Sequence, residues 1–160
     1  MGTSTNAILA YGYNLGGPEE GWAVREADGD GLLRTDWYDE DNDDDDGADF
    51  VAAAEKRLLT AVGFTETDYK APGYSDRRKI AEAQIGVVFD AYCHIDFPLY
   101  IMATNVITVR RGNMEYLDLH ALAGEPAHHN WDEQLTVALR ILGITPIQPQ
   151  PDWLLCSYWG

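Results

Sequence analysis

The sequence predicts one α+β domain spanning residues 1–160, with a mixed or mostly antiparallel sheet of five to six strands packed against two main helices, 49–62 and 131–142. Two segments repeat apolar residues at helical spacing, and several shorter segments are rich in β-branched and aromatic residues. A chain of 160 residues, 46% of them hydrophobic, is also long enough for one domain with a sizeable core.

The first elements are strands followed by a long loop. Ile8–Tyr13 is apolar and aromatic and predicts a buried strand. Gly16-Gly17-Pro18 then marks a turn, and Trp22-Ala23-Val24 predicts a short second strand. Glycine and aspartate are concentrated at about 28–48, which predicts a long acidic loop.

The first helix is expected to begin after Asp49, whose carboxylate can accept hydrogen bonds from free amides of the first turn. Gly63 provides a C-terminal stop. One face of this helix should be buried, because its apolar residues recur at intervals of four, four and three: Phe50, Ala54, Leu58 and Ala61.

The middle of the chain predicts a short helix and three strands. Ser75 is the expected cap of a helix through Ala83. Residues 85–92 and 100–109 have strand composition. Arg111-Gly112-Asn113 then predicts a hairpin turn, with residues 114–119 as the returning strand.

The last predicted elements are a helix and a strand. Asn130 and Glu133 have the spacing of a capping box. The apolar face of the helix consists of Trp131, Leu135, Ala138 and Leu142. Residues 153–158 predict a final strand, which we expect to pair with the N-terminal strand in the centre of the sheet.

Negative charge is concentrated in one segment. The formal net charge is −16, and residues 19–49 contain 14 acidic residues against only Arg25 and Arg34, a local charge of −12. The other 129 residues therefore share −4. A chain of this charge is expected to bind neither nucleic acid nor an anionic membrane directly, because phosphate groups require a basic surface.

One interpretation of the acidic segment is a calcium site. Asn42, Asp44 and Asp46 match the first three ligand positions of an EF-hand loop, and Gly47 matches its invariant glycine. Ala53 stands where that loop requires a bidentate glutamate, so the match is incomplete. A weak calcium site of another kind stays open, and no other cofactor is expected.

The favoured interpretation is a surface that binds another protein. Its candidate residues are the other acids of the run: Asp39, Glu40, Asp41, Asp43 and Asp45. A second alternative is that the run imitates a nucleic-acid backbone and inhibits a nucleic-acid-binding protein. The run can equally dock on basic residues of a second copy, which would give a homodimer, or be only a solvated connection.

The sequence does not predict an enzyme. It contains none of the common nucleotide-binding, serine-hydrolase or zinc-protease motifs. Cys93 and Cys156 are expected to be reduced, buried thiols, and the sequence leaves open whether they meet in space. Cys93 and His94 are adjacent and therefore do not form a nucleophile–base pair. Paired carboxylates are available from Asp90, Asp96 and Glu82, although nothing in their spacing distinguishes them from ordinary surface acids.

Both ends of the chain carry a resemblance. Residues 5–17, TNAILAYGYNLGG, and residues 153–160, WLLCSYWG, resemble small, uncharacterised acidic proteins of actinobacteria and their phages. That group has no established activity, so the resemblance implies only a bacterial setting, including phage infection. The N-terminal segment lacks the pattern of a secretory signal, and we expect a cytoplasmic protein. Together these observations predict a small, non-enzymatic interaction protein that modulates a partner.

Overall fold

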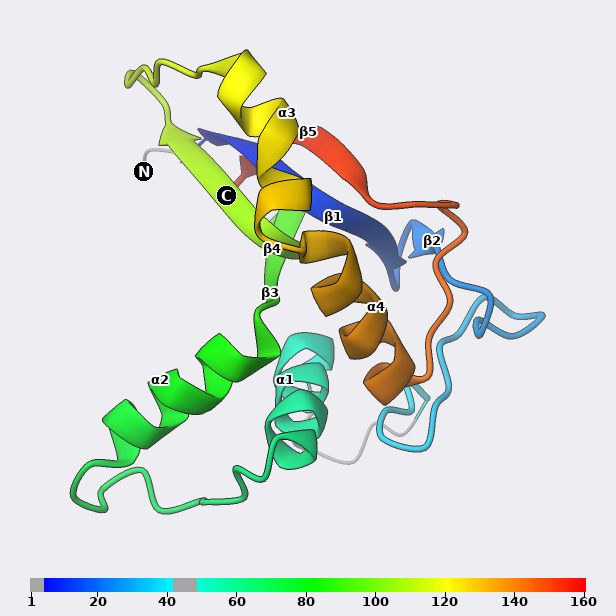
Figure 1. The fold of residues 1–160 in the computed structure, drawn as a ribbon. Helices are drawn as coiled ribbons and strands as arrows, with labels where there is room; N and C mark the ends of the chain where they lie inside the picture. Colours follow the sequence, from blue (N-terminus) through cyan, green and yellow to red (C-terminus); the bar gives the residue numbers. More distant parts are fainter. Residues whose placement is uncertain (1–4, 42–48) are drawn as a thin grey trace.

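The computed structural model describes residues 5–41 and 49–160 (Figure 1). Its described elements follow in the order β1 (Thr5–Gly17), β2 (Gly21–Trp22), α1 (Phe50–Ala61), α2 (Tyr74–Ile85), β3 (Val88–His94), β4 (Pro98–Arg110), α3 (Leu119–His128), α4 (Trp131–Leu142) and β5 (Asp152–Trp159). One mixed five-stranded sheet and four helices confirm the predicted α+β class.

The sheet has the strand order β2-β1-β4-β3-β5, and β1 also pairs with β5. Every pairing is antiparallel except β3 with β5, which run parallel and meet at Cys93–Tyr158 and His94–Trp159. Because β1, β4, β3 and β5 each pair with two of the others, these four strands close into a ring. The predicted pairing of the chain ends is confirmed, with Ile8 opposite Cys156.

Two apolar clusters lie on the two faces of this curved sheet. The smaller cluster contains residues from all four strands of the ring: Ile8, Ala10, Ile101 and Ala103, with Tyr92, Leu154, Cys156 and Tyr158 packed against them. The larger cluster joins the other face to α1, α4 and the loop after β2. Gly12 allows β1 to approach β4 closely, because a Cβ atom at this position would clash with the backbone oxygen of Met102.

The two main helices begin and end close to the predicted residues. Asp49 caps α1 by accepting a hydrogen bond from the Val51 amide at 3.1 Å. The buried face of α1 ends with Leu58 and Leu59. Ala61, which was predicted to belong to this face, is exposed. The predicted face of α4 is fully buried. Asn130 has left-handed backbone geometry (φ 57°) and no side-chain cap bond, so the predicted capping box is wrong.

Two predictions for the middle of the chain are also wrong. The helix α2 follows Gly73 rather than Ser75, because the left-handed geometry at that glycine (φ 74°) places the turn two residues earlier. Residues 114–118 form no strand, although β3 pairs with β4 only over residues 98–103 and does not occupy that edge beside residues 104–110. Instead Asp118 caps the unpredicted helix α3 by accepting from the amides of His120 and Ala121.

The helices differ in how much they contribute to the core. Figure 1 shows α1 and α4 close to the sheet, whereas α2 projects away from it beyond α1. Ala81 is the one buried residue of α2. This arrangement leaves a hollow between α1, α2 and the start of β3. None of the helices described in residues 5–41 and 49–160 is long and apolar enough to span a membrane.

Candidate binding site between α1 and α2

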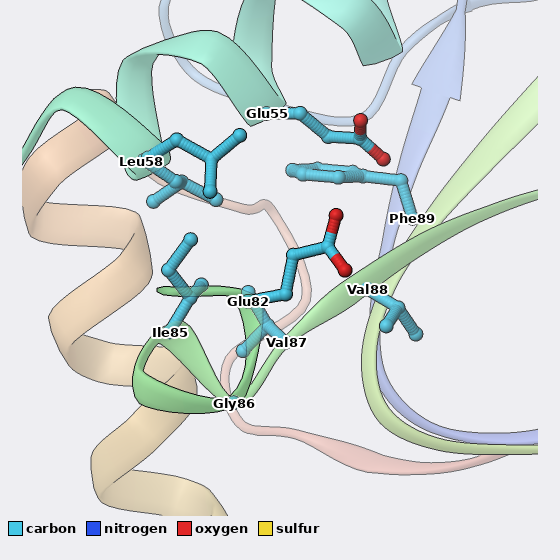
Figure 2. A pocket seen from close by; sticks show the side chains of 9 residues that line it. Glu55, Leu58, Glu82, Ile85, Gly86, Val87, Val88 and Phe89 are labelled. Atoms are coloured by element: carbon cyan, nitrogen blue, oxygen red, sulfur yellow. The ribbon is translucent and has the colours of Figure 1, made fainter. Parts of the chain in front are cut away.

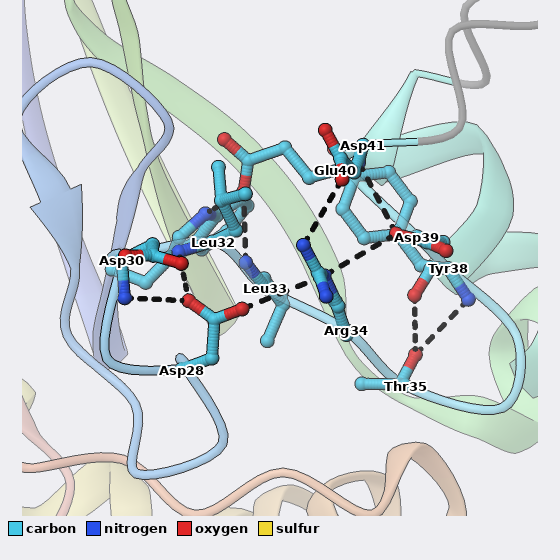
Figure 3. A network of polar contacts seen from close by, with 11 residues as sticks. Asp28, Asp30, Leu32, Leu33, Arg34, Thr35, Tyr38, Asp39, Glu40 and Asp41 are labelled. Atoms are coloured by element: carbon cyan, nitrogen blue, oxygen red, sulfur yellow. Dashed lines mark hydrogen bonds and ion pairs between the residues drawn. The ribbon is translucent and has the colours of Figure 1, made fainter.

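The described part of the acidic segment is held by hydrogen bonds and ion pairs within the chain (Figure 3). Arg34 lies among three carboxylates and pairs with Asp28 at 3.5 Å, Asp39 at 3.8 Å and Asp41 at 3.0 Å. The amide of Leu32 donates to Asp28, and this bond holds the pKa of the Asp28 carboxyl below its ordinary value. Much of the charge in residues 28–41 therefore organises the loop itself.

Among the three predicted partner-binding residues that the structure describes, Asp39, Glu40 and Asp41, Glu40 is the most strongly held. Its Oε2 atom accepts from the indole Nε1 of Trp22 at 2.7 Å and from the amide of Leu33 at 2.8 Å. Trp22 and Leu33 are both buried in the larger cluster. The Glu40 carboxylate therefore supports the core, while Asp39 and Asp41 beside it are exposed.

We expect Glu40→Ala to lower the free energy of unfolding by about 2–3 kcal/mol, because it leaves two donors of buried residues without a protein acceptor. Asp41→Ala removes the same charge from an exposed position and should change it by less than about 0.5 kcal/mol. Unfolding in guanidinium, monitored by tryptophan fluorescence, measures the change in unfolding free energy for both substitutions. Equal effects of the two substitutions would contradict a supporting role for Glu40.

The remaining predicted site residues, Asn42, Asp43, Asp44, Asp45 and Asp46, lie outside the described residues. The calcium site that the sequence suggests therefore stays a prediction. Within residues 5–41 and 49–160, no group of three or more histidine, cysteine or acidic side chains is placed to hold a metal ion. Cys93 and Cys156 are free thiols; Cys93 is exposed rather than buried, because it lies at the end of β3 beside the turn into β4.

A cavity of about 520 Å³ lies between α1, α2 and the first residues of β3. Most of its lining is apolar: Leu58, Leu59, Ile85, Val87, Val88 and Phe89. Two acidic side chains, Glu55 from α1 and Glu82 from α2, complete the lining together with Gly86. Figure 2 shows both carboxylate groups directed toward Phe89. The site therefore combines an apolar floor with negative charge.

Arg78 of α2 joins the two carboxylates. Its Nη2 lies 3.2 Å from Glu55 Oε2, and its Nε lies 2.7 Å from Glu82 Oε1. All three side chains are about 40–50% exposed, so each ion pair is partly screened by water and contributes less than about 1 kcal/mol. The pair with Glu55 links α1 to α2, and the pair with Glu82 is an i,i+4 contact within α2.

Glu55 is held in a less polar environment than an ordinary surface acid. Burial raises the pKa of the Glu55 carboxyl, and the nearby charges of Glu82 and Asp49 add to this effect. Arg78 acts in the opposite direction, yet the pKa of Glu55 remains raised. The ionised carboxylate is thus less stabilised than in water, and an additional positive charge close to it would be favourable.

A second cavity of about 530 Å³ is lined in part by Glu55 and Arg78. It is lined by α1, α2 and the connection between them, including Phe64, Glu66 and Tyr74. Glu55 and Leu59 line both cavities, so the two lie next to each other along α1 and α2, and we call them together the α1–α2 groove. This groove is large enough for several side chains of a bound segment.

The sequence did not predict this groove. Glu55, Arg78 and Phe89 come from three elements that are adjacent only in the fold. Two local signals were available: Glu55 lies four positions before Leu59 on α1, and Arg78 lies four positions before Glu82. Neither signal indicates a cavity, because the cavity depends on how α2 projects from the domain.

Comparison with protein-family models, with curated proteins and with solved structures finds no match for this chain. We therefore infer its function from its own residues.

Proposed function

We propose that this protein is a non-enzymatic interaction protein that binds another protein through the groove between α1 and α2. The observation that carries the proposal is the cavity of about 520 Å³, which is open to solvent and lined mainly by apolar side chains. Pockets that accept anchoring side chains of a partner are a common basis of protein recognition. The bacterial or phage setting of such a modulator is part of this proposal and comes from the sequence resemblance.

The position of α2 supports a binding role. Apart from Ala81, the side chains of α2 are exposed or half-buried, and Ile80 on this helix is a large exposed apolar residue. Left-handed glycines, Gly73 and Gly86, stand at its two ends. A helix held mainly by one neighbour can adjust its position around a bound segment at small cost.

The chemistry of the cavity favours binding over catalysis. Among the described residues that line it there is no hydroxyl, thiol or imidazole group. Its two carboxylates share Arg78, which neutralises much of their charge. Such a lining can recognise a side chain but offers no nucleophile with an adjacent base.

The acidic run is proposed as a second contact for the same partner. Asp39 and Asp41 are exposed, so their charges are accessible, together with those proposed for Asp43 and Asp45. Glu40 is less suited to this role because its carboxylate already accepts two hydrogen bonds inside the chain.

Filling the cavity mouth tests the proposed site. Val88 is 50% exposed and lines the cavity, so Val88→Trp should obstruct it without disturbing the buried core. Val137 is 39% exposed on α4 and lies outside the groove lining, which makes Val137→Trp a matched control. We expect proteins retained from bacterial lysate by the unmodified chain to be retained at least about tenfold less by Val88→Trp, a loss of about 1.4 kcal/mol, and unchanged by Val137→Trp.

Quantitative mass spectrometry of the retained proteins measures this difference. Equal retention by both variants would contradict binding through the groove. Replacing Asp39, Asp41, Asp43 and Asp45 by Asn in the same assay tests the second contact while keeping Glu40, and retention that does not change would remove the acidic run from the proposal.

A further inference from the structure

We propose that the groove recognises a positively charged side chain, lysine or arginine, of a basic segment in the partner protein. In this arrangement the aliphatic stem packs on the apolar floor of the cavity and the cationic group lies between Glu55 and Glu82. The inference rests on the proposed function, since it names the chemistry that the α1–α2 groove would bind.

The first support is the charge of the cavity lining. Glu55 and Glu82 line the cavity of about 520 Å³, and none of its other described lining residues is basic, whereas Lys56 and Arg78 line the second cavity. Both carboxylates contact the same guanidinium, so two negative charges share one positive charge. One further cation would neutralise the remaining negative charge at this position, whereas an anion would be repelled by it.

The second support is the combination of an apolar floor with charged groups near it. Figure 2 shows Leu58 and Ile85 on the side of the cavity away from the two carboxylates. Lysine and arginine carry three or four methylene groups behind a charged head, and they bury the stem while the head stays near water. A purely apolar side chain would use the floor but leave the carboxylates without a new partner.

The third support is the geometry of Arg78. The Glu55 and Glu82 oxygens approach two different nitrogens of one guanidinium, at 3.2 Å and 2.7 Å. The chain thus already places a cation against this pair of carboxylates, and the remaining carboxylate lone pairs can accept from a second donor. The partly exposed ion pairs of Arg78 can also rearrange to admit that donor.

Two small probes of equal chain length separate charge recognition from apolar binding. We would titrate the complete protein with n-hexylammonium and, separately, with n-hexanol, and follow the backbone amide signals of residues 82–89 by NMR. We expect n-hexylammonium to bind at least about fivefold more tightly than n-hexanol. Added salt should reduce this preference, because the carboxylates are partly exposed.

Charge-removing variants identify the carboxylates responsible. Glu55→Gln and Glu82→Gln retain the shape of the side chain, and each should reduce the preference for n-hexylammonium at least about threefold. Glu19→Gln removes the same charge from an exposed turn between β1 and β2 and should leave the preference unchanged. An equal loss in all three variants would show a general effect of net charge and would overturn the assignment.

The pH dependence gives a second readout. The charged groups that act on Glu55 are Arg78 and Glu82 of α2 and Asp49 before α1. A bound cation favours ionised Glu55, so n-hexylammonium should bind less tightly as the pH falls through the raised pKa of this carboxyl. In Glu55→Gln this part of the pH dependence should disappear, and its persistence would exclude Glu55 as the recognition group.

The outcomes distinguish the two proposals. If n-hexanol binds in the groove as tightly as n-hexylammonium, cation recognition is wrong, while the groove remains a site for an apolar side chain. If neither probe shifts the amide signals of residues 82–89, both the inference and the proposed site are wrong.

Discussion

Deletion of Asp152–Gly160 is expected to unfold the domain. These residues form β5, whose eight residue pairs with β1 and parallel contact with β3 close the ring of strands. The deletion also removes three side chains from the smaller apolar cluster, and Trp153 from the larger one. The combined loss exceeds the about 5–15 kcal/mol by which domains of this size are usually stable.

Far-UV circular dichroism and guanidinium titration measure this effect, and a pair of substitutions controls for the shorter chain. Leu154→Asp places a charge against the smaller cluster and should cost more than about 2 kcal/mol. Leu155→Asp affects the next residue, which is 78% exposed, and should cost less than about 0.5 kcal/mol. A truncated protein that still unfolds cooperatively would show that β5 is peripheral.

The pairing of β1 with β5 was predictable because both ends of the chain carry continuous apolar and aromatic residues. The two main helices were predictable from spacing, and Asp49 from its capping chemistry. For the helices and the cap the signal is local, and the residues that create it are within about four positions of one another.

The region after β4 shows why other elements were not predictable. Residues 114–119, MEYLDL, follow the turn signal Arg111-Gly112-Asn113 and were therefore predicted to form the returning strand of a hairpin. A free edge is not sufficient for such a segment to join a sheet: β3 pairs with β4 only over residues 98–103, yet residues 114–118 do not form a strand beside the rest of that edge. Asp118 then favours a helix locally by capping α3.

The candidate site was less predictable than the fold. The acidic run dominates the sequence, but the described part of it is largely occupied with Arg34, Trp22 and Leu33. The cavity depends instead on two ordinary glutamates, Glu55 and Glu82, that meet only when α2 lies beside α1. A position of this kind has no local sequence signature, because it follows from the packing of separate elements.

Phe50→Ala should have the largest effect of any single substitution in the core, about 3–5 kcal/mol. Phe50 is 2% exposed, and its ring lies within 4.7–6.1 Å, centre to centre, of five others: Trp22, Trp37, Tyr38, Phe89 and Tyr100. These rings come from β2, from the loop after β2, from β3 and from β4. Removing the Phe50 ring leaves a cavity where those four parts of the chain meet.

Phe97→Ala is the matched control, because this ring is 48% exposed and should cost less than about 1 kcal/mol by guanidinium unfolding. A cost of Phe50→Ala below about 1 kcal/mol would contradict its central position. Phe50 also supports Phe89, which lines the proposed binding cavity. The substitution should therefore weaken n-hexylammonium binding even where the protein remains folded, since the floor of the cavity would lose the ring that positions it.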